Sequence, residues 1–142
     1  MTLENATERL RLRDNFIVVS HDGPDADGLG AAYALVLALA SIGKRAIAVV
    51  ATKPSRKYAF IDRSKLFVSL DESKTLPFEI SKATLVILDT HDTGYLGSRI
   101  AELLDASACK IILDHHELTT EPGADEFVDP LASSSCELVY LV

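Results

Sequence analysis

Hydrophobic residues in this sequence gather in short continuous runs, which are separated by longer apolar segments of helical length. Four short runs are rich in valine, isoleucine and leucine, and each is bounded by polar or turn residues. Runs of this kind are typical of strands that are buried on both faces of a sheet. We therefore predict strands at residues 15–20, 45–52, 84–90 and 109–114, with a further short strand at 65–70.

Two helices are predicted between these strands. Residues 28–43 join the first two runs and residues 95–107 join the last two, with Gly43 as a C-terminal stop signal. Alternating strands and helices predict an α/β fold, a three-layer sandwich with a mostly parallel sheet, helices on both faces and right-handed crossovers. The serines at 133–135 predict the capped start of one more helix.

Composition and charge narrow the class of protein. The chain has 142 residues, of which 48% are hydrophobic and 25% charged, so we expect one domain with one packed core. The net charge of −7 argues against general binding to nucleic acid or to an acidic membrane. The longest apolar run, 31–43, is too short to span a bilayer, and no secretory signal precedes it. Cys109 and Cys136 form no CxxC motif, so we expect a cytoplasmic protein without a membrane partner.

Acidic and histidine residues stand directly after three of the predicted strands. Because the carboxyl ends of parallel strands meet at one edge of a sheet, we expect these side chains to form a single site. The residues are His21, Asp25 and Asp27 after the first strand, Asp89, His91 and Asp92 after the third, and Asp114, His115 and His116 after the fourth.

Each cluster also has a simpler interpretation. Asp27 and Asp89 are suited to capping a following helix or turn, and His91 is compatible with an exposed loop. A calcium-binding loop is excluded because Ala34 occupies the position that requires a bidentate glutamate. A dinucleotide-binding fingerprint is disfavoured because Tyr33 replaces its third glycine and acids crowd the turn. None of these interpretations accounts for all three clusters together.

The residue types indicate which metal the site would bind. Carboxylates mixed with imidazoles, without a thiolate cluster, suit manganese best, and Mg²⁺ or Co²⁺ also fit. One carboxylate is able to bridge two ions about 3.5–4 Å apart, and such a pair activates water for displacement at phosphorus. We therefore expect two divalent metal ions, with Mn²⁺ as the first choice.

Four motifs carry a resemblance to a known family. "SHDGPDADGLG", "ILDTHD", "ILDHHE" and "FVDPLASSSCELVY", in that order, resemble the DHH phosphoesterase superfamily. The resemblance runs from about Asn15 to the C-terminus. Within the superfamily, the chain is similar to manganese-dependent oligoribonuclease/pAp phosphatase and RecJ-like proteins. It implies a metal-dependent phosphoesterase domain.

The resemblance also implies roles for individual residues. The implied ligands of one metal ion are His21, Asp25 and Asp89, and those of the other are Asp27, Asp89 and His115, so that Asp89 bridges them. Asp114 resembles a group that orients the histidine pair, and His116 resembles a contact to the scissile phosphate.

Two family features are missing from the motifs. A T-D-T-G-like motif, whose aspartate completes the second metal site, and a smaller C-terminal substrate-binding domain would follow in family members of this type. We therefore expect residues 1–142 to be a truncated DHH-type domain that is only feebly active alone, with the metal sites empty or only the first occupied.

The functional hypotheses follow from this assignment. The first is hydrolysis of nucleotides or short oligonucleotides by a water activated by two metal ions, and an alternative enzyme is a polyphosphate or pyrophosphate hydrolase. A different class of function is a non-catalytic nucleotide-binding or regulatory module. The expected partner is a phosphate-containing small molecule or a short single-stranded nucleic acid, and homo-oligomer formation is left open.

Overall fold

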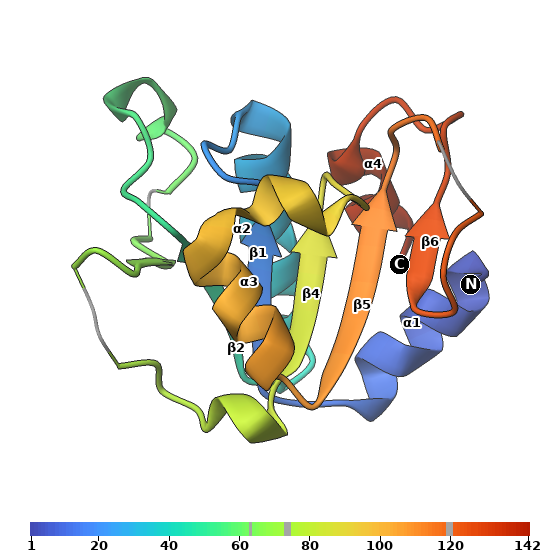
Figure 1. Cartoon of the computed structure of the whole chain (residues 1–142), viewed down its shortest axis with the longest axis horizontal. Coiled ribbons are helices and arrows are strands. Elements are labelled where there is room, and N and C mark those ends of the chain that lie inside the picture. Colours follow the sequence, from blue (N-terminus) through green and yellow to red (C-terminus); the bar gives the residue numbers. More distant parts are fainter. Residues whose placement is uncertain (63, 73–74, 119–120) are drawn as a thin grey trace.

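Six parallel strands form one sheet in the computed structural model, which describes residues 1–62, 64–72, 75–118 and 121–142 (Figure 1). The strands are β1 (Phe16–Ser20), β2 (Ala46–Val50), β3 (Phe67–Ser69), β4 (Thr84–Leu88), β5 (Cys109–Asp114) and β6 (Glu126–Val128). Their order across the sheet is β3-β2-β1-β4-β5-β6, and every neighbouring pair is parallel.

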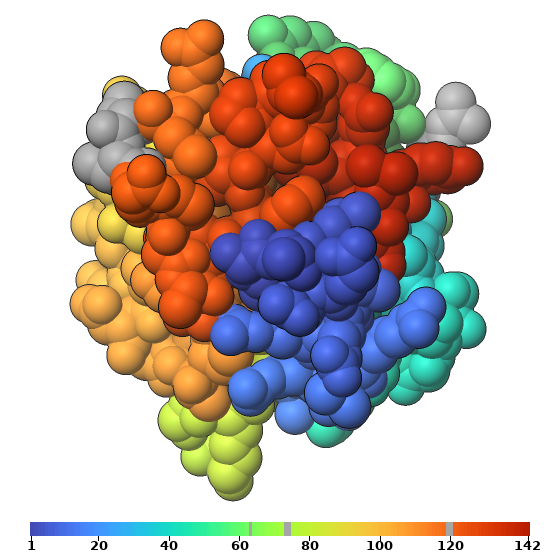
Figure 2. Space-filling view, turned by 90° about the vertical axis from the view of Figure 1, so that its right-hand side faces the viewer, coloured from blue at the N-terminus to red at the C-terminus, as the bar shows by residue number. Residues whose placement is uncertain are grey.

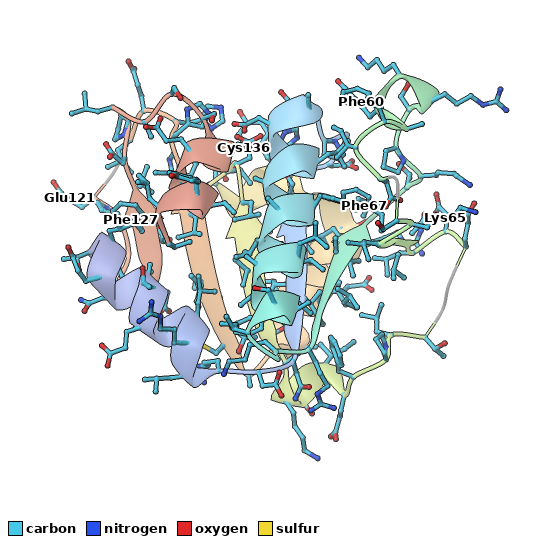
Figure 3. All side chains as sticks on the ribbon, turned by 180° about the vertical axis from the view of Figure 1, so that it is seen from behind. Phe60, Lys65, Phe67, Glu121, Phe127 and Cys136 are labelled. Atoms are coloured by element: carbon cyan, nitrogen blue, oxygen red, sulfur yellow. The ribbon has the colours of Figure 1, made fainter. Side chains whose placement is uncertain are left out.

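Helices cover both faces of this sheet. The α-helices are α1 (Leu3–Leu12), α2 (Ala26–Ser41), α3 (Gly97–Ala106) and α4 (Ser135–Leu141), with short 3-10 turns η1 (Arg56–Tyr58), η2 (Ile80–Lys82) and η3 (Thr93–Leu96). Helix α3 lies on one face (Figure 1), and α1, α2 and α4 lie on the other (Figure 3). The predicted α/β three-layer sandwich is therefore confirmed.

Alternation along the central strand explains why both faces are covered. Phe16 and Val18 pack toward α2, whereas Ile17 and Val19 pack toward α3, and all four are fully buried. Burial of such side chains contributes roughly 1.5–3 kcal/mol each. A strand that is apolar at every position therefore needs a helix layer on each side, as the sequence pattern predicted.

The predicted strands and helices are confirmed, with small differences at their ends. The third predicted strand ends at Leu88, and the short run at 65–70 contains the three-residue strand β3. Gly43 has φ +79° just after α2, a left-handed conformation that favours glycine, so its assignment as a stop is also confirmed.

Helix α2 is the apolar segment that the sequence assigned to the core. Its Leu35, Val36 and Leu39 side chains are buried against the sheet. Within the part of the chain that the structure describes, no helix is both long and apolar enough to cross a membrane.

Helix α1 and strand β6 are elements that the hydrophobic pattern did not predict. They lie against each other, as the space-filling view shows for the N-terminal helix (blue) and the orange-red C-terminal segments (Figure 2). The Met1 amino group donates to the Glu126 carbonyl at 2.8 Å, and Arg9 pairs with Asp125 at 2.5 Å. These contacts join the two ends of the described fold.

The sheet has a topological switch point between β1 and β4, where the chain stops adding strands on one side of β1 and begins to add them on the other. Successive connections move outward through β2 and β3 on one side, and through β5 and β6 on the other. In open parallel sheets, such a reversal leaves a crevice beyond the carboxyl ends of the two central strands, and ligands bind there. The topology therefore places a candidate site at the carboxyl ends of β1 and β4.

Candidate metal centre

The acidic and histidine residues converge at the reversal point of the sheet. His21 follows β1, Asp89 follows the neighbouring strand β4, and His115 follows β5. Strands β1 and β4 end level with each other, because Ser20 pairs in register with Leu88. The three strands therefore present these side chains to one edge, which is how parallel topology brings distant motifs together.

Asp25 and Asp27 reach the same edge from the start of α2. Asp25 is the N-cap of the helix, and its Oδ1 accepts from the backbone N–H groups of Asp27 at 2.9 Å and of Gly28 at 3.2 Å. The alternative in which Asp27 caps a helix starting near Gly28 is therefore wrong, because α2 begins at Ala26 and places Asp27 within its first turn.

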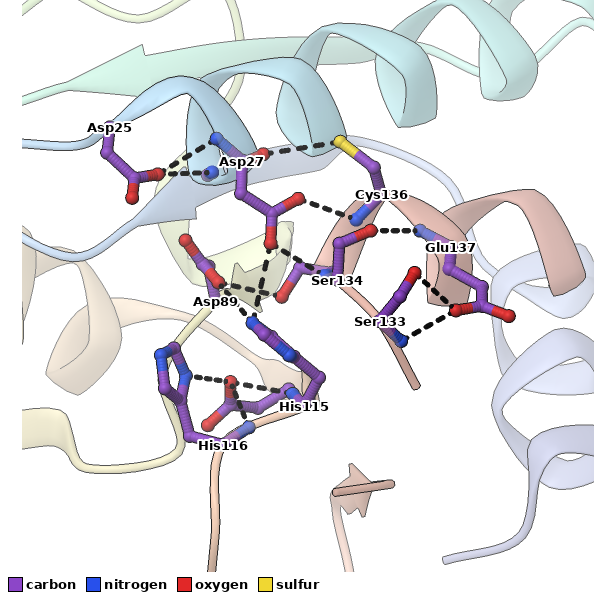
Figure 4. A network of polar contacts seen from close by, with 12 residues as sticks. Asp25, Asp27, Asp89, His115, His116, Ser133, Ser134, Cys136 and Glu137 are labelled. Atoms are coloured by element: carbon purple, nitrogen blue, oxygen red, sulfur yellow. Dashed lines mark hydrogen bonds and ion pairs between the residues drawn. The ribbon is translucent and has the colours of Figure 1, made fainter. Parts of the chain in front are cut away.

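Asp27 is held by the beginning of α4. Its Oδ2 accepts from the Ser135 backbone N–H at 2.8 Å, and its Oδ1 accepts from the Cys136 backbone N–H at 2.9 Å (Figure 4). Both N–H groups belong to the first turn of α4, where backbone N–H groups have no acceptor within the helix. The carboxylate that the first turn of α2 carries is thus held by the first turn of α4.

Asp89 occupies the centre of the cluster. Its side chain is 3% exposed, and its backbone has φ +66°, a left-handed conformation that Asp and Asn adopt more readily than most residues. The Ser135 hydroxyl donates to Asp89 Oδ1 at 2.9 Å in a buried contact (Figure 4). A Cβ at Gly28 would lie 3.1 Å from Asp89 Oδ2 and 2.2 Å from Ser20 Oγ, so glycine is needed there.

The distances around Asp89 leave room for ions between the ligand atoms. His21 Nε2 is 3.5 Å from Asp89 Oδ2, and His115 Nε2 is 3.5 Å from both Asp89 Oδ1 and Asp27 Oδ2. Among the described residues, one ligand atom each from His21, Asp25 and Asp89 lies within 4.8 Å of the others. This trio coincides with the predicted ligand set of one metal ion.

The second predicted ligand set is arranged differently from the first. Asp89 and His115 share a group, again within 4.8 Å, with His116 rather than with Asp27. Asp27 still faces His115 but is engaged with α4. The five predicted ligand residues therefore meet at one edge of the sheet, and their carboxylate and imidazole donors fit hard or borderline divalent ions such as Mn²⁺.

Asp114 connects two histidine rings behind the cluster. The fully buried Asp114 accepts from His116 Nδ1 at 2.7 Å through Oδ1, and His91 Nδ1 lies 2.5 Å from Oδ2. The predicted role was to orient the pair His115 and His116. In the structure Asp114 bonds the backbone N–H of His115 at 2.8 Å, and the rings that it fixes are those of His116 and His91.

A comparison with family models identifies the chain. The model described as the DHH family, N-terminal domain, matches residues 15–142, which is most of the sequence. This chain belongs to the DHH family. The resemblance inferred from the four sequence motifs is thereby confirmed.

Two relatives of this DHH-family chain differ in how they are described. One is the uncharacterized protein MG371 homolog of Mycoplasma pneumoniae, 26% identical over 149 residues, which cover 99% of this chain and 41% of that protein. The other is the cyclic-di-AMP phosphodiesterase PdeA of Listeria monocytogenes, 26% identical over 146 residues, which cover 93% of this chain and 21% of PdeA. The chain thus spans less than half the length of either relative.

A solved structure shares the fold of the DHH-family chain. The crystal structure of an exopolyphosphatase-related protein from Bacteroides fragilis matches it with a TM-score of 0.83 and 24% sequence identity. The match covers 97% of this chain and 41% of that chain. This likeness shows that the three-layer architecture is common to both proteins.

Burial and the crowding of carboxylates both shift the pKa of Asp89 in this DHH-family site. Burial is the largest influence and raises the pKa of Asp89 above its usual range, and the nearby charges of Asp27 and Asp25 raise it further. The hydrogen bond from Ser135 acts in the opposite direction without reversing the shift. A divalent cation at this position would favour the ionised form of Asp89 and so oppose both the effect of burial and the smaller repulsion from Asp27 and Asp25.

The pKa of Asp27 is lowered, whereas that of Asp89 is raised, although both carboxylates lie at the same site. Burial alone would raise its pKa, but hydrogen bonds from Cys136 and Ser135, together with the nearby His115, lower the pKa overall. Burial beside this carboxylate raises the pKa of the Cys136 thiol to about 12. The thiol therefore stays protonated, and the donors of the site are carboxylates and imidazoles.

The pKa values of Asp114 and His116 are also shifted, in opposite directions. Burial would raise the pKa of Asp114, but hydrogen bonds from His91 and His116 outweigh it and lower the pKa. The same hydrogen bond to Asp114 raises the pKa of His116, against the effect of burial. An ionised Asp114 thus binds both rings through their Nδ1 atoms and leaves their Nε2 atoms available.

Ser135 is a site residue that sequence reasoning missed. The "SSSC" stretch predicts a helix start and belongs to a motif of the family resemblance, but neither gives Ser135 a role in the site; the structure confirms that Ser134 caps α4 by accepting from Glu137 N–H at 3.1 Å. A local pattern carries no sign that the next residue reaches Asp89. The partner of His91 was likewise left open and is Asp114.

Proposed function

We propose that this chain is the hydrolytic domain of a metal-dependent phosphoesterase that acts on nucleotides or short oligonucleotides. The observation that carries the proposal is the convergence of two carboxylates and two imidazoles on Asp89: Asp25 and Asp27 come from the start of α2, and His21 and His115 follow strands β1 and β5. The phosphodiesterase name of the Listeria relative supports a nucleotide substrate.

The ligand assignment is part of this proposal. His21, Asp25 and Asp89 would hold one divalent ion, and Asp27, Asp89 and His115 would hold the other, with Mn²⁺ preferred. Ions bound there supply charge neutralisation at phosphorus and lower the pKa of water.

The protein's own groups would position the ligands and the substrate. Ser135 and the first N–H groups of α4 hold Asp89 and Asp27 in place. Asp114 holds the His116 ring by Nδ1, and the half-exposed ring can present Nε2 to a phosphate oxygen. Such partners typically change metal affinity or activity about 10- to 100-fold when they are removed.

The test is hydrolysis of a substrate panel with Mn²⁺ by the Asp89→Asn variant. Asparagine tolerates the left-handed backbone at this position but removes the shared charge. We expect hydrolysis of adenosine 3′,5′-bisphosphate, short RNA and cyclic dinucleotides to fall by about 100-fold or more. Asp105→Asn, at an exposed position on α3, is the matched control and should keep its activity.

Three outcomes would contradict the proposal. Full activity of Asp89→Asn would remove the shared carboxylate from the mechanism. Nucleotide binding in calorimetry without turnover by the unaltered protein would favour a binding module instead. Hydrolysis restricted to pyrophosphate or tripolyphosphate would replace the nucleotide assignment with the alternative hydrolase.

A further inference from the structure

A cavity of about 380 Å³ adjoins the carboxylate cluster on the side of the loop that joins β4 to α3. It shares His21, Asp89 and His116 with the candidate metal centre. Its volume lies within the range of about 300–1,000 Å³ that is usual for small-molecule sites. Whatever fills this space would therefore be attached to, or lie next to, a phosphate at the metal centre.

The charges that line the cavity are mainly negative. The described lining residues include no lysine or arginine, and they contribute the carboxylates of Asp89, Asp92, Asp114 and Glu117. A chain of phosphates carries a charge on every unit and would be repelled by such a wall. The uncharged part of a phosphoester, whose hydroxyl and amino groups donate hydrogen bonds, suits carboxylate acceptors.

The wall contains two rings, of which the His91 ring is held by a side-chain contact, whereas Tyr95 is anchored through its backbone. The His91 ring is fixed by its 2.5 Å contact with Asp114. Tyr95 stands on η3, where its N–H donates to the Asp92 carbonyl at 3.1 Å and its carbonyl accepts from Asp22 N–H at 2.7 Å. The Tyr95 side chain is nevertheless largely exposed, since the residue is 68% accessible. An exposed ring on an anchored turn is a ready surface for stacking.

We propose that this cavity is a nucleoside subsite, in which the base of the substrate stacks on Tyr95 and the sugar lies against His91. Asp92 and Glu117 accept hydrogen bonds from the sugar hydroxyls or from amino groups of the base. The inference rests on the proposed phosphoesterase function and narrows it, because it selects nucleoside phosphates over polyphosphates. His91 thereby acquires a role in substrate positioning.

The test compares Tyr95→Ala, Tyr95→Phe and the control Tyr140→Ala, which alters an exposed tyrosine near the end of α4. Kinetics with Mn²⁺ would use adenosine 3′,5′-bisphosphate and pyrophosphate. Base–aromatic stacking predicts that Tyr95→Ala lowers kcat/KM for the bisphosphate about tenfold, mainly through KM. Pyrophosphate hydrolysis should change less than about twofold, and Tyr95→Phe and Tyr140→Ala should behave like the unaltered protein.

Equal losses on both substrates would overturn the subsite, as would an unchanged KM for the bisphosphate. A direct binding measurement separates this result from a failure of the proposed activity. Calorimetry with AMP and inorganic phosphate should show that AMP binds more tightly and that Tyr95→Ala weakens only AMP binding. If AMP binds no more tightly than phosphate, the cavity is not a nucleoside subsite, whether or not the protein hydrolyses either substrate.

Discussion

Ser135 shows how a single hydroxyl can organise a metal site at the residue scale. It is fully buried, and its Oγ donates to Asp89 Oδ1 while its backbone N–H donates to Asp27. Removing the hydroxyl would leave the Asp89 carboxylate with greater freedom and a higher affinity for protons than before. The effect should therefore appear in metal binding more than in folding.

We expect Ser135→Ala to weaken Mn²⁺ binding about 10- to 100-fold in calorimetry. The matched control is Ser134→Ala, which removes the cap of α4 and costs about 1 kcal/mol of stability without touching Asp89. If both variants bind Mn²⁺ with the affinity of the unaltered protein, Ser135 does not position the shared carboxylate.

The sequence predicts most of the clustered residues but not how each is held. The positions after strands identify His21, Asp89 and His115, because parallel topology places all strand ends at one edge. Ser135 lies 46 residues from its partner Asp89, and only the packing of α4 on α2 brings them together. Local patterns contain no information on such a contact.

At the element scale, helix α2 approaches the site closely only because position 28 has no side chain. Gly28→Ala would place its Cβ 2.2 Å from Ser20 Oγ and 3.1 Å from Asp89 Oδ2. Because Ser20 is a short side chain on a central strand, we expect a loss of stability of about 1–3 kcal/mol together with weaker Mn²⁺ binding. Urea unfolding and metal calorimetry would measure the two effects.

Gly30→Ala is the comparison within the same helix. Its Cβ would meet only Cys136 Sγ at 3.1 Å, and alanine favours the helix by about 1 kcal/mol. We expect its stability to equal or exceed that of the unaltered protein. A Gly28→Ala variant as stable as Gly30→Ala would show that α2 can move away from the site without cost.

The sequence predicts a strand well when both faces of that strand are buried along most of its length. Strands β1, β4 and β5 are each buried over four or more successive residues that are mostly valine, isoleucine or leucine, so their hydrophobic pattern is unambiguous. Helix α1 buries only Ala6 and Leu10, and β6 is a half-buried strand of three residues. The hydrophobic pattern of such short or mostly polar segments is too weak to predict a helix or a strand. Their structure depends instead on their contact with each other.

At the scale of the whole molecule, the ionised Asp89 carboxylate lowers the free energy of unfolding when no metal is bound. Asp89 has a raised pKa because burial and two neighbouring acids disfavour its charge. A raised pKa in the folded state means that stability is lost as the pH rises from the unfolded value of 3.8 through the folded value. At neutral pH the metal-free protein therefore carries the full penalty of an ionised Asp89.

We expect metal-free Asp89→Asn to be more stable than the unaltered protein at neutral pH, by on the order of 1 kcal/mol. The gain should shrink toward zero as the pH falls below the unfolded pKa, and excess Mn²⁺ should stabilise only the unaltered protein. Urea unfolding in EDTA and in Mn²⁺ at several pH values would measure this. A variant that is less stable at neutral pH would show that Asp89 has a structural role that outweighs the repulsion.

The contact between α1 and β6 has a consequence for the order of events during protein synthesis. Arg9 emerges from the ribosome long before its partner Asp125, which follows 116 residues later in the chain. Helix α1 has little apolar surface of its own and lies on a sheet edge that does not yet exist when the helix is made. Helix α1 is synthesised before the other described elements and is therefore among the last of them to dock. Until β6 has formed, the apolar face of α1 stays exposed on the nascent chain and is open to contacts with other molecules.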